Sequence, residues 1–287
     1  MKVLKFGGTS VGSAENIKKV KEIVQSQNGD VIVVVSALGG ITDKILTAAN
    51  NASTGTGDFH TELKEIKIKH DEVIHSLFNG SGSIKYIVAE LLDELEQILT
   101  GITLVGELTP KTLDRIAGIG ERISSNIVAQ FLGADRKDAS EFIRTDSNFG
   151  KAIVNFKETD KNIQEAFNDF SGIAVVPGFI SKNAKGEFTT IGRGGSDYTA
   201  AIISAALNVE ILEIWTDVNG FMTADPRVIS KAYTIPELTY SEAMELSHFG
   251  AKVIYPPTIL PVFQKGIPIL IKNTFEPENP GTRISRT

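Results

Sequence analysis

The stretch "KFGGTS", residues 5–10, decides how the rest of the chain is read. It follows directly on apolar residues, so residues 2–6 predict a short strand that ends at two glycines. Ser13 and Glu15 then suit the start of a helix, as N-cap and first-turn acid. Glycines before a helix N-terminus expose backbone N–H groups beside partial positive charge, which favours an anion. The stretch therefore predicts an anion site, with a plain structural turn beside a solvated lysine as the alternative.

Beyond this turn, strand and helix patterns alternate along the chain. Apolar residues at helical spacing fill residues 17–24, and "VIVVVSA" at 31–37 has the unbroken apolar character of a strand covered on both faces. A helix is expected from Thr42, and residues 58–133 should be mostly helical, with Gly133 as a stop. This order predicts a βαβ array. Further strands are expected at 152–156, 172–181, 211–218 and 267–273, and further helices at 198–208 and 240–251.

The composition is that of an ordinary globular protein, with 41% apolar and 22% charged residues among 287. This length suits one large α/β domain or two lobes that share a cleft. The absence of cysteine excludes disulfides and thiolate metal sites. No run approaches the roughly 20 apolar residues of a membrane span, and fold-like sequence begins at once, so we expect a cytoplasmic protein. A net charge of −6 without a basic block argues against a nucleic-acid partner.

A second glycine turn, "GRGGSD" at 192–197, also lies between a strand and a helix pattern. It contains Arg193, suited to bidentate recognition of carboxylate or phosphate, and Asp197. No Walker A loop is present, and "GIGERI" at 118–123 lacks the third glycine and the preceding strand of a dinucleotide fingerprint. Two such turns suggest that two anions are brought together, as phosphoryl transfer requires. That chemistry needs no covalent nucleophile from the protein.

With both turns in view, the chain resembles the aspartate kinase family, within the amino acid kinase fold. The motifs "KFGGTS", "VSALGGITD", "GRGGSDYTA", "WTDVNG", "ADPRV" and "FGAKV" stand in the family's order and span almost the whole chain. The resemblance implies an ATP-dependent kinase that makes 4-phospho-L-aspartate, the first step towards lysine, methionine and threonine. It also implies a three-layer α/β/α sandwich with a mainly parallel sheet. Residues 1–195 would bind the amino acid and carry the catalytic lysine, and residues 196–276 would bind ATP.

The resemblance also assigns roles to the residues of the amino-acid side. Lys5 would contact the transferring phosphoryl group, and Asp197 would hold that lysine in place. Arg193 would grip the α-carboxylate of aspartate, and Glu121 would meet its ammonium group, where the alternative is a helix-surface residue. Ser36 closes the second strand, where ligands of parallel sheets bind. Hydrogen bonds to the substrate are expected from Thr42 and Ser196, and a phosphate path from Gly7, Gly8 and Ser10.

On the nucleotide side, the resemblance matches Thr216 and Asp217 to residues that hold adenosine. Arg227 and Lys252 match phosphate contacts. Met222 stands where bacterial relatives carry tyrosine, so that contact with the nucleotide would be apolar. Tyr255, outside the predicted site residues, replaces a histidine, which puts details of nucleotide affinity in doubt but not activity.

No metal ligand is predicted from the protein. His70 and His75 are five residues apart and fall on different helix faces, so they do not suit a metal pair. Magnesium would arrive with ATP and keep mainly water and phosphate ligands, and no prosthetic group is expected.

Other functions stay open beside this one. A sister kinase would act on glutamate, N-acetylglutamate, carbamate or a nucleoside monophosphate, although Glu121 suits a free ammonium better. A non-catalytic regulatory module is the other alternative, and the retained Lys5, Asp197, Arg193 and Lys252 argue against it. The resemblance leaves a homo-oligomer open. In the family, ACT domains or a homoserine dehydrogenase region would follow the polar tail 277–287, so we expect a catalytic domain without feedback inhibition.

Overall fold

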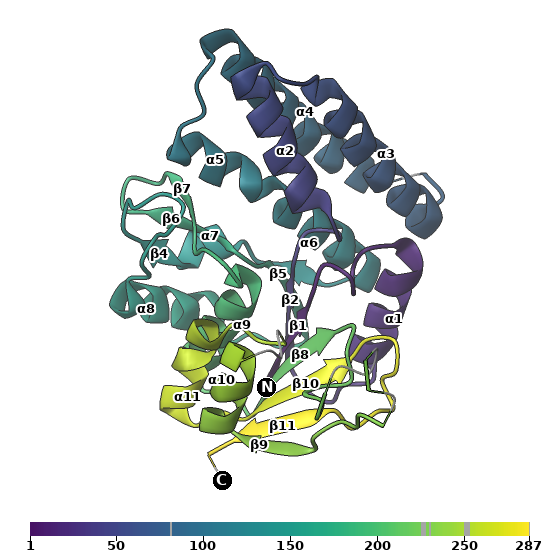
Figure 1. Cartoon of the computed structure of the whole chain (residues 1–287), viewed down its shortest axis with the longest axis vertical. Coiled ribbons are helices and arrows are strands. Elements are labelled where there is room, and N and C mark those ends of the chain that lie inside the picture. Colours follow the sequence, from purple (N-terminus) through teal and green to yellow (C-terminus); the bar gives the residue numbers. More distant parts are fainter. Residues whose placement is uncertain (81, 225–227, 230, 250–252, 287) are drawn as a thin grey trace.

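The computed structural model describes residues 1–80, 82–224, 228–229, 231–249 and 253–286, which include an eight-stranded sheet (Figure 1). The strand order is β3-β5-β2-β1-β8-β10-β11-β9, and each neighbouring pair is parallel except β10 with β11. This confirms the mainly parallel α/β fold. The strands are β1 (Lys2–Phe6), β2 (Val31–Val35), β3 (Asp135–Arg136), β5 (Ile173–Pro177), β8 (Leu212–Thr216), β9 (Glu237–Thr239), β10 (Ile269–Asn273) and β11 (Thr282–Ser285).

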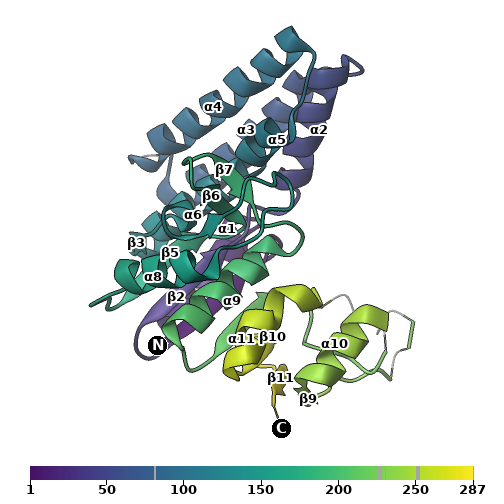
Figure 2. The same cartoon turned by 90° about the vertical axis from the view of Figure 1, so that its left-hand side faces the viewer.

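Helices cover both faces of the sheet. In Figures 1 and 2, α2, α3 and α4 gather at one end of the molecule, far from α10 and α11. The helices are α1 (Ala14–Gln25), α2 (Ile41–Thr54), α3 (Phe59–Phe78), α4 (Ile84–Val105), α5 (Pro110–Ala117), α6 (Ile119–Leu132), α7 (Ala139–Phe142), α8 (Phe156–Ala166), α9 (Gly195–Leu207), α10 (Tyr240–Phe249) and α11 (Leu260–Lys265), with a 3₁₀ turn η1 (Pro256–Ile259). No helix in the described ranges is long and apolar enough to span a membrane.

Two hydrophobic cores lie on opposite faces of the sheet because side chains alternate along each strand. On β1, Leu4 and Phe6 join the core that contains α1 to α4 and α6. Val3 joins the core formed with α7, α8, α9 and α11. All five residues of β2 are buried, as predicted for a strand covered on both sides.

Helix boundaries follow the signals in the sequence. The Ser13 side chain accepts a hydrogen bond from the Asn16 N–H at 3.2 Å and so caps α1, as predicted. Gly133 ends α6 with a left-handed backbone, also as predicted. The described residues between 59 and 132 form four helices, which confirms the mostly helical middle.

Three strand predictions need correction. Residues 152–156 contain only an isolated bridge at Val154, because Asn155 caps α8 by accepting from the Glu158 N–H. The segment 172–181 is divided between β5 and the start of another strand by a bend at Phe179, whose φ is 71°. The second part belongs to a small separate sheet of β4 (Arg144–Thr145), β6 (Ile180–Asn183) and β7 (Phe188–Thr190).

The third correction concerns the polar tail 277–287, in which no strand was predicted. Residues 282–285 instead form β11, between β10 and β9. Thr282 is fully buried, and its hydroxyl donates to the Ile235 carbonyl at 2.6 Å and accepts from the Phe221 N–H at 2.8 Å. The strands of residues 1–195 and those that follow lie on opposite sides of the β1–β8 boundary in the large sheet. The functional division into two lobes remains a prediction.

Candidate active site

The site begins at the carboxyl end of β1. Val3 faces the core that contains α9, and Lys5, two residues further, points to the same side. Asp197 lies in the first turn of α9. The Lys5 ammonium and the Asp197 carboxylate are therefore brought to 2.8 Å, with the two side chains only 11% and 15% exposed. This geometry fixes a positive charge at the centre of the sheet.

The glycines after β1 allow two loops to touch. The Gly39 N–H donates to the Gly8 carbonyl at 3.0 Å, and a Cβ on Gly8 would come within 3.1 Å of the Ala37 carbonyl oxygen. Gly7 donates to the Trp215 carbonyl at 3.2 Å, which joins the end of β1 to the end of β8. Gly8 is thus needed for close backbone packing, whereas a Cβ on Gly7 would meet no atom closer than 3.5 Å.

The structure shows contacts of Ser10 that the sequence does not predict. Its side chain is fully buried, and its hydroxyl lies 2.7 Å from the Thr274 hydroxyl and 3.3 Å from the Trp215 carbonyl. A hydroxyl with these partners and no exposed surface holds the loop to β8 and β10. Its place on the phosphate path stays a prediction.

Arg193 lies on an exposed loop between two glycines of left-handed backbone, Gly192 and Gly194. Its guanidinium carbon is 5.5 Å from the centroid of the Tyr255 ring, a cation–π contact. Ser196, at the start of α9, is so close to Gly178 that a Cβ there would lie 2.6 Å from the Ser196 Cβ. The Tyr255 contact was not foreseen from the sequence, which connected Tyr255 only with nucleotide affinity.

Glu121 lies on α6, not on the molecular surface. It is 4% exposed, and its Oε2 atom has no hydrogen-bond partner among the described residues. Burial raises the pKa of its carboxyl to about 7, although the backbone N–H groups of Glu121 and Ala37 act in the opposite direction. A buried carboxylate with a free oxygen is suited to receive a cationic group.

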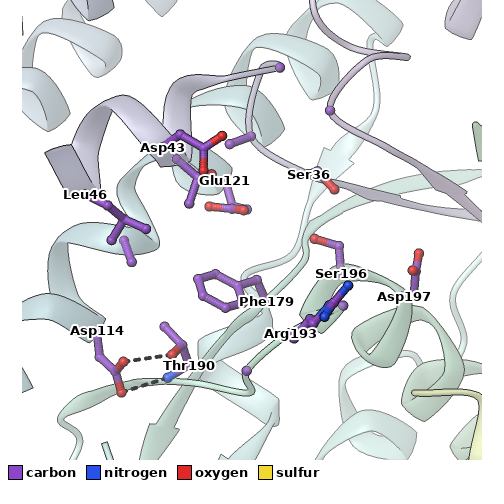
Figure 3. A pocket seen from close by; sticks show the side chains of 18 of the residues that line it. Ser36, Asp43, Leu46, Asp114, Glu121, Phe179, Thr190, Arg193, Ser196 and Asp197 are labelled. Carbon is purple, nitrogen blue, oxygen red and sulfur yellow. Dashed lines mark hydrogen bonds between the residues drawn. The ribbon is translucent and has the colours of Figure 1, made fainter. Parts of the chain in front are cut away.

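One cavity of about 560 Å³ collects most of the predicted amino-acid side (Figure 3). Arg193, Ser196 and Asp197 border it from the loop and from α9, whereas Glu121 borders it from α6. The other predicted residues in its lining are Lys5, Gly8, Ser36 and Thr42. The lining also includes residues that the sequence reasoning missed, namely Asp43, Leu46, Asp114, Phe179 and Thr190.

The cavity lining does not include Thr216, Asp217 or Met222, which are predicted on the nucleotide side. Thr216 ends β8, next to the end of β1, and its hydroxyl donates to the Asp217 carboxylate at 3.2 Å. Met222 follows and forms an isolated bridge with Thr234. Arg227 and Lys252 lie outside the described residues, so their predicted phosphate contacts stay predictions.

No protein metal site is found in the part of the chain that the structure describes. No group of three or more His, Asp or Glu side chains there could hold a metal ion. His70 is fully buried, and its Nδ1 atom lies 2.8 Å from the Ile66 carbonyl oxygen.

Comparison with known proteins agrees with this geometry. The model of the amino acid kinase family matches residues 1–273. The chain belongs to the amino acid kinase family. It is 35% identical to Aspartokinase 1, chloroplastic, of Arabidopsis thaliana, over 99% of this chain and 52% of the relative. It is also 35% identical to an Arabidopsis bifunctional aspartokinase/homoserine dehydrogenase, over 99% of this chain and 32% of that protein.

The fold of this chain is similar to that of a solved aspartokinase structure. The E. coli aspartokinase III structure in complex with aspartate and ADP superposes with a TM-score of 0.91 at 32% identity, covering all of this chain and 65% of the other. The resemblance to aspartate kinases that the motifs predict is thereby confirmed. The chain spans about half the length of Aspartokinase 1 and about a third of the bifunctional relative.

Proposed function

We propose that this chain transfers the γ-phosphoryl group of ATP to the side-chain carboxylate of L-aspartate, giving 4-phospho-L-aspartate and ADP. The observation that carries this proposal is the charge pattern of the cavity, which Lys5, Arg193 and Glu121 all border. The relatives named as aspartokinases, and the related structure that contains aspartate and ADP, support the choice of substrates.

L-Aspartate has two carboxylates and one ammonium, and each finds a counterpart in this cavity. The Arg193 guanidinium suits the α-carboxylate through two parallel hydrogen bonds. The free Glu121 oxygen suits the ammonium group. The second carboxylate is then directed to the Lys5 end of the cavity. Ser36, Ser196 and the Thr42 hydroxyl are the remaining polar groups proposed to orient the substrate.

In the reaction, a side-chain carboxylate oxygen of aspartate attacks the γ-phosphorus, and the bond from that phosphorus to the β,γ-bridging oxygen breaks. ADP leaves with the electron pair of the broken bond. The Lys5 ammonium stabilises the negative charge on the transferring group, and Asp197 keeps the ammonium at its position. The attacking oxygen comes from the substrate, so no protein side chain forms a covalent bond.

ATP is proposed to bind at the adjoining ends of β1 and β8, where Thr216 ends β8 and Asp217 and Met222 follow it. Gly7 and Gly8 would border the phosphates. Magnesium would enter with ATP and supply charge compensation on the phosphates. We assign no protein ligand to it, because the described residues offer no suitable cluster.

The buried Glu121 carboxylate argues against the sister kinases that act on N-acetylglutamate or a nucleoside monophosphate. An N-acetylated amine or a nucleotide phosphate brings no cation to an unpartnered carboxylate, and a phosphate would be repelled by it. L-Aspartate and L-glutamate both carry the ammonium, so they differ only in the reach of the reacting carboxylate. Glutamate is therefore the second candidate substrate.

Hydroxylamine trapping tests the proposal. Purified protein with Mg-ATP and hydroxylamine should give the hydroxamate from L-aspartate, and much less from L-glutamate or N-acetyl-L-glutamate. Lys5→Met should give far less hydroxamate than the wild type. Its matched control is Lys18→Met, which removes an exposed lysine from α1. Hydroxamate from glutamate alone would assign another substrate, and no product from any acid would point to a non-catalytic module.

A further inference from the structure

The loop of residues 190–194, here called the clamp loop, contains Arg193 between glycines with φ values of 78° and 70°. Glycines permit many backbone conformations, so the direction of Arg193 depends on how the two ends of the loop are held. At the downstream end, the Tyr198 N–H donates to the Gly194 carbonyl at 3.0 Å. The upstream end is Thr190, the last residue of β7.

A buried carboxylate from another element holds that upstream end. Asp114, on α5, is 3% exposed. Its Oδ2 atom accepts from the Thr190 N–H at 3.1 Å, and its Oδ1 atom accepts from the Thr190 hydroxyl at 2.7 Å (Figure 3). Oδ2 also accepts from the Gly150 N–H at 2.9 Å. Asp114 thus connects α5, the clamp loop and the loop around residue 150.

Burying the Asp114 carboxylate has a desolvation cost that a purely structural link would not require. No salt bridge to it is found in the described part of the chain, and burial raises the pKa of its carboxyl against the effect of its three hydrogen bonds. A helix can be packed against a strand by apolar side chains without this desolvation cost. Asp114 and Thr190 also border the same cavity as Arg193. These features favour a role in the site.

We propose that Asp114 is a positioning residue for substrate binding: it fixes Thr190 and so sets the direction from which Arg193 meets the α-carboxylate. This inference rests on the proposed function, since it assumes that Arg193 binds aspartate. Asp114 acts through the clamp loop and does not itself touch the substrate. Neutralising it should therefore affect aspartate more than ATP.

The test compares Asp114→Asn with Asp138→Asn, a matched control. Asp138 is a carboxylate at the start of α7 that also accepts hydrogen bonds from one residue's N–H and hydroxyl, those of Ser140, at 3.0 and 2.8 Å. It does not border the cavity. We expect the KM for aspartate to rise roughly tenfold in Asp114→Asn, because a tenfold change corresponds to the loss of about one buried hydrogen bond to a charged group. The KM for ATP and kcat should stay within about twofold of the wild-type values. Asp138→Asn should leave all three constants unchanged.

A second variant and a second measurement keep the inference testable if Asp114→Asn folds poorly or if the wild type proves inactive. Thr190→Val removes only the hydroxyl donor and should raise the aspartate KM by a smaller factor. Hydrogen exchange of the peptide 190–197 should be roughly tenfold faster in Asp114→Asn than in Asp138→Asn, whatever the enzyme's activity. Wild-type protein without hydroxamate product would refute the proposed function, and the exchange rates would still decide the role of Asp114.

Two results would overturn the inference. One is an unchanged aspartate KM, or unchanged exchange of the 190–197 peptide, in a folded Asp114→Asn protein. The other is an equal rise of the KM values for aspartate and ATP, because a general loosening of the fold would affect both substrates.

Discussion

Replacing Glu121 by glutamine should make the protein more stable above neutral pH. Burial raises the pKa of this carboxyl from 4.5 to about 7. At about 1.36 kcal/mol for each pH unit between two pKa values, this corresponds to about 3 kcal/mol. The folded state holds the proton more tightly than the unfolded state. The stability from this group is therefore fully present below pH 4.5 and is lost as the pH rises through about 7.

Glutamine keeps the shape of the side chain but has no charge to bury. The free energy of unfolding of Glu121→Gln minus that of the wild type should therefore increase by about 3 kcal/mol between pH 4.5 and pH 8. Urea denaturation of both proteins at several pH values measures this difference. The exposed Glu90 gives the matched control, and Glu90→Gln should show a difference that stays constant over the same range.

The same carboxyl should lose its proton when the substrate binds, since an ammonium group beside Glu121 favours its ionised form. At pH 6.5, calorimetric titration with aspartate in two buffers of different ionisation enthalpy should show release of a fraction of a proton. A stability difference that does not change with pH would refute the buried, protonated Glu121. Unchanged proton release in Glu121→Gln would refute its contact with the ammonium.

Three further predictions concern other charged groups. Lys5→Met should fold but lose roughly 10²-fold or more in kcat, because it removes the cation that stabilises the transferring group; kcat near that of the wild type would exclude Lys5 from the mechanism. Arg193→Lys should raise the KM for aspartate more than that for ATP, because an ammonium cannot form the bidentate contact; the reverse pattern would assign Arg193 to the nucleotide. Burial lowers the pKa of His70 to about 4, so stability present above pH 6.5 should fall by about 3 kcal/mol as the pH drops towards 4. His70→Leu should remove this loss in urea denaturation, and an equally steep loss in that variant would place the acid sensitivity elsewhere.

The fold was predictable where a local signal and a long-range contact agree. β1, α1 and β2 each have the expected apolar pattern, and their motifs end at the same edge of the sheet because neighbouring strands are parallel. The proximity of Lys5 and Asp197 follows from strand alternation once α9 is known to cover that face. The pairing of these two residues was predicted only by the family resemblance, and the structure supplies the contact between them.

The other features of the fold and the site depend on packing between segments that are far apart in the sequence. The spacing of residues along the chain does not indicate such contacts. Asp114 looks like an ordinary helix residue until α5 is placed against β7, 76 positions away. The contact of Ser10 with Thr274 joins residues 264 positions apart. β11 has only two buried side chains and lies in a polar stretch, so the sequence predicts a polar tail there and no strand. The contact of Tyr255 with Arg193 likewise requires the 3₁₀ segment to fold back over the clamp loop.

The charged side chains that border the cavity differ in whether they have a partner within the protein. Lys5 has Asp197, and Arg193 rests on an aromatic ring, so both cations are partly compensated before any substrate binds. Glu121 has a buried oxygen with no partner among the described residues, and its ionised form is destabilised by burial. A ligand gains most where the protein has left a group unsatisfied. The ammonium group of the substrate is therefore the feature that this cavity should recognise most strictly, and the length of the acid is recognised by the distance of its second carboxylate from Lys5.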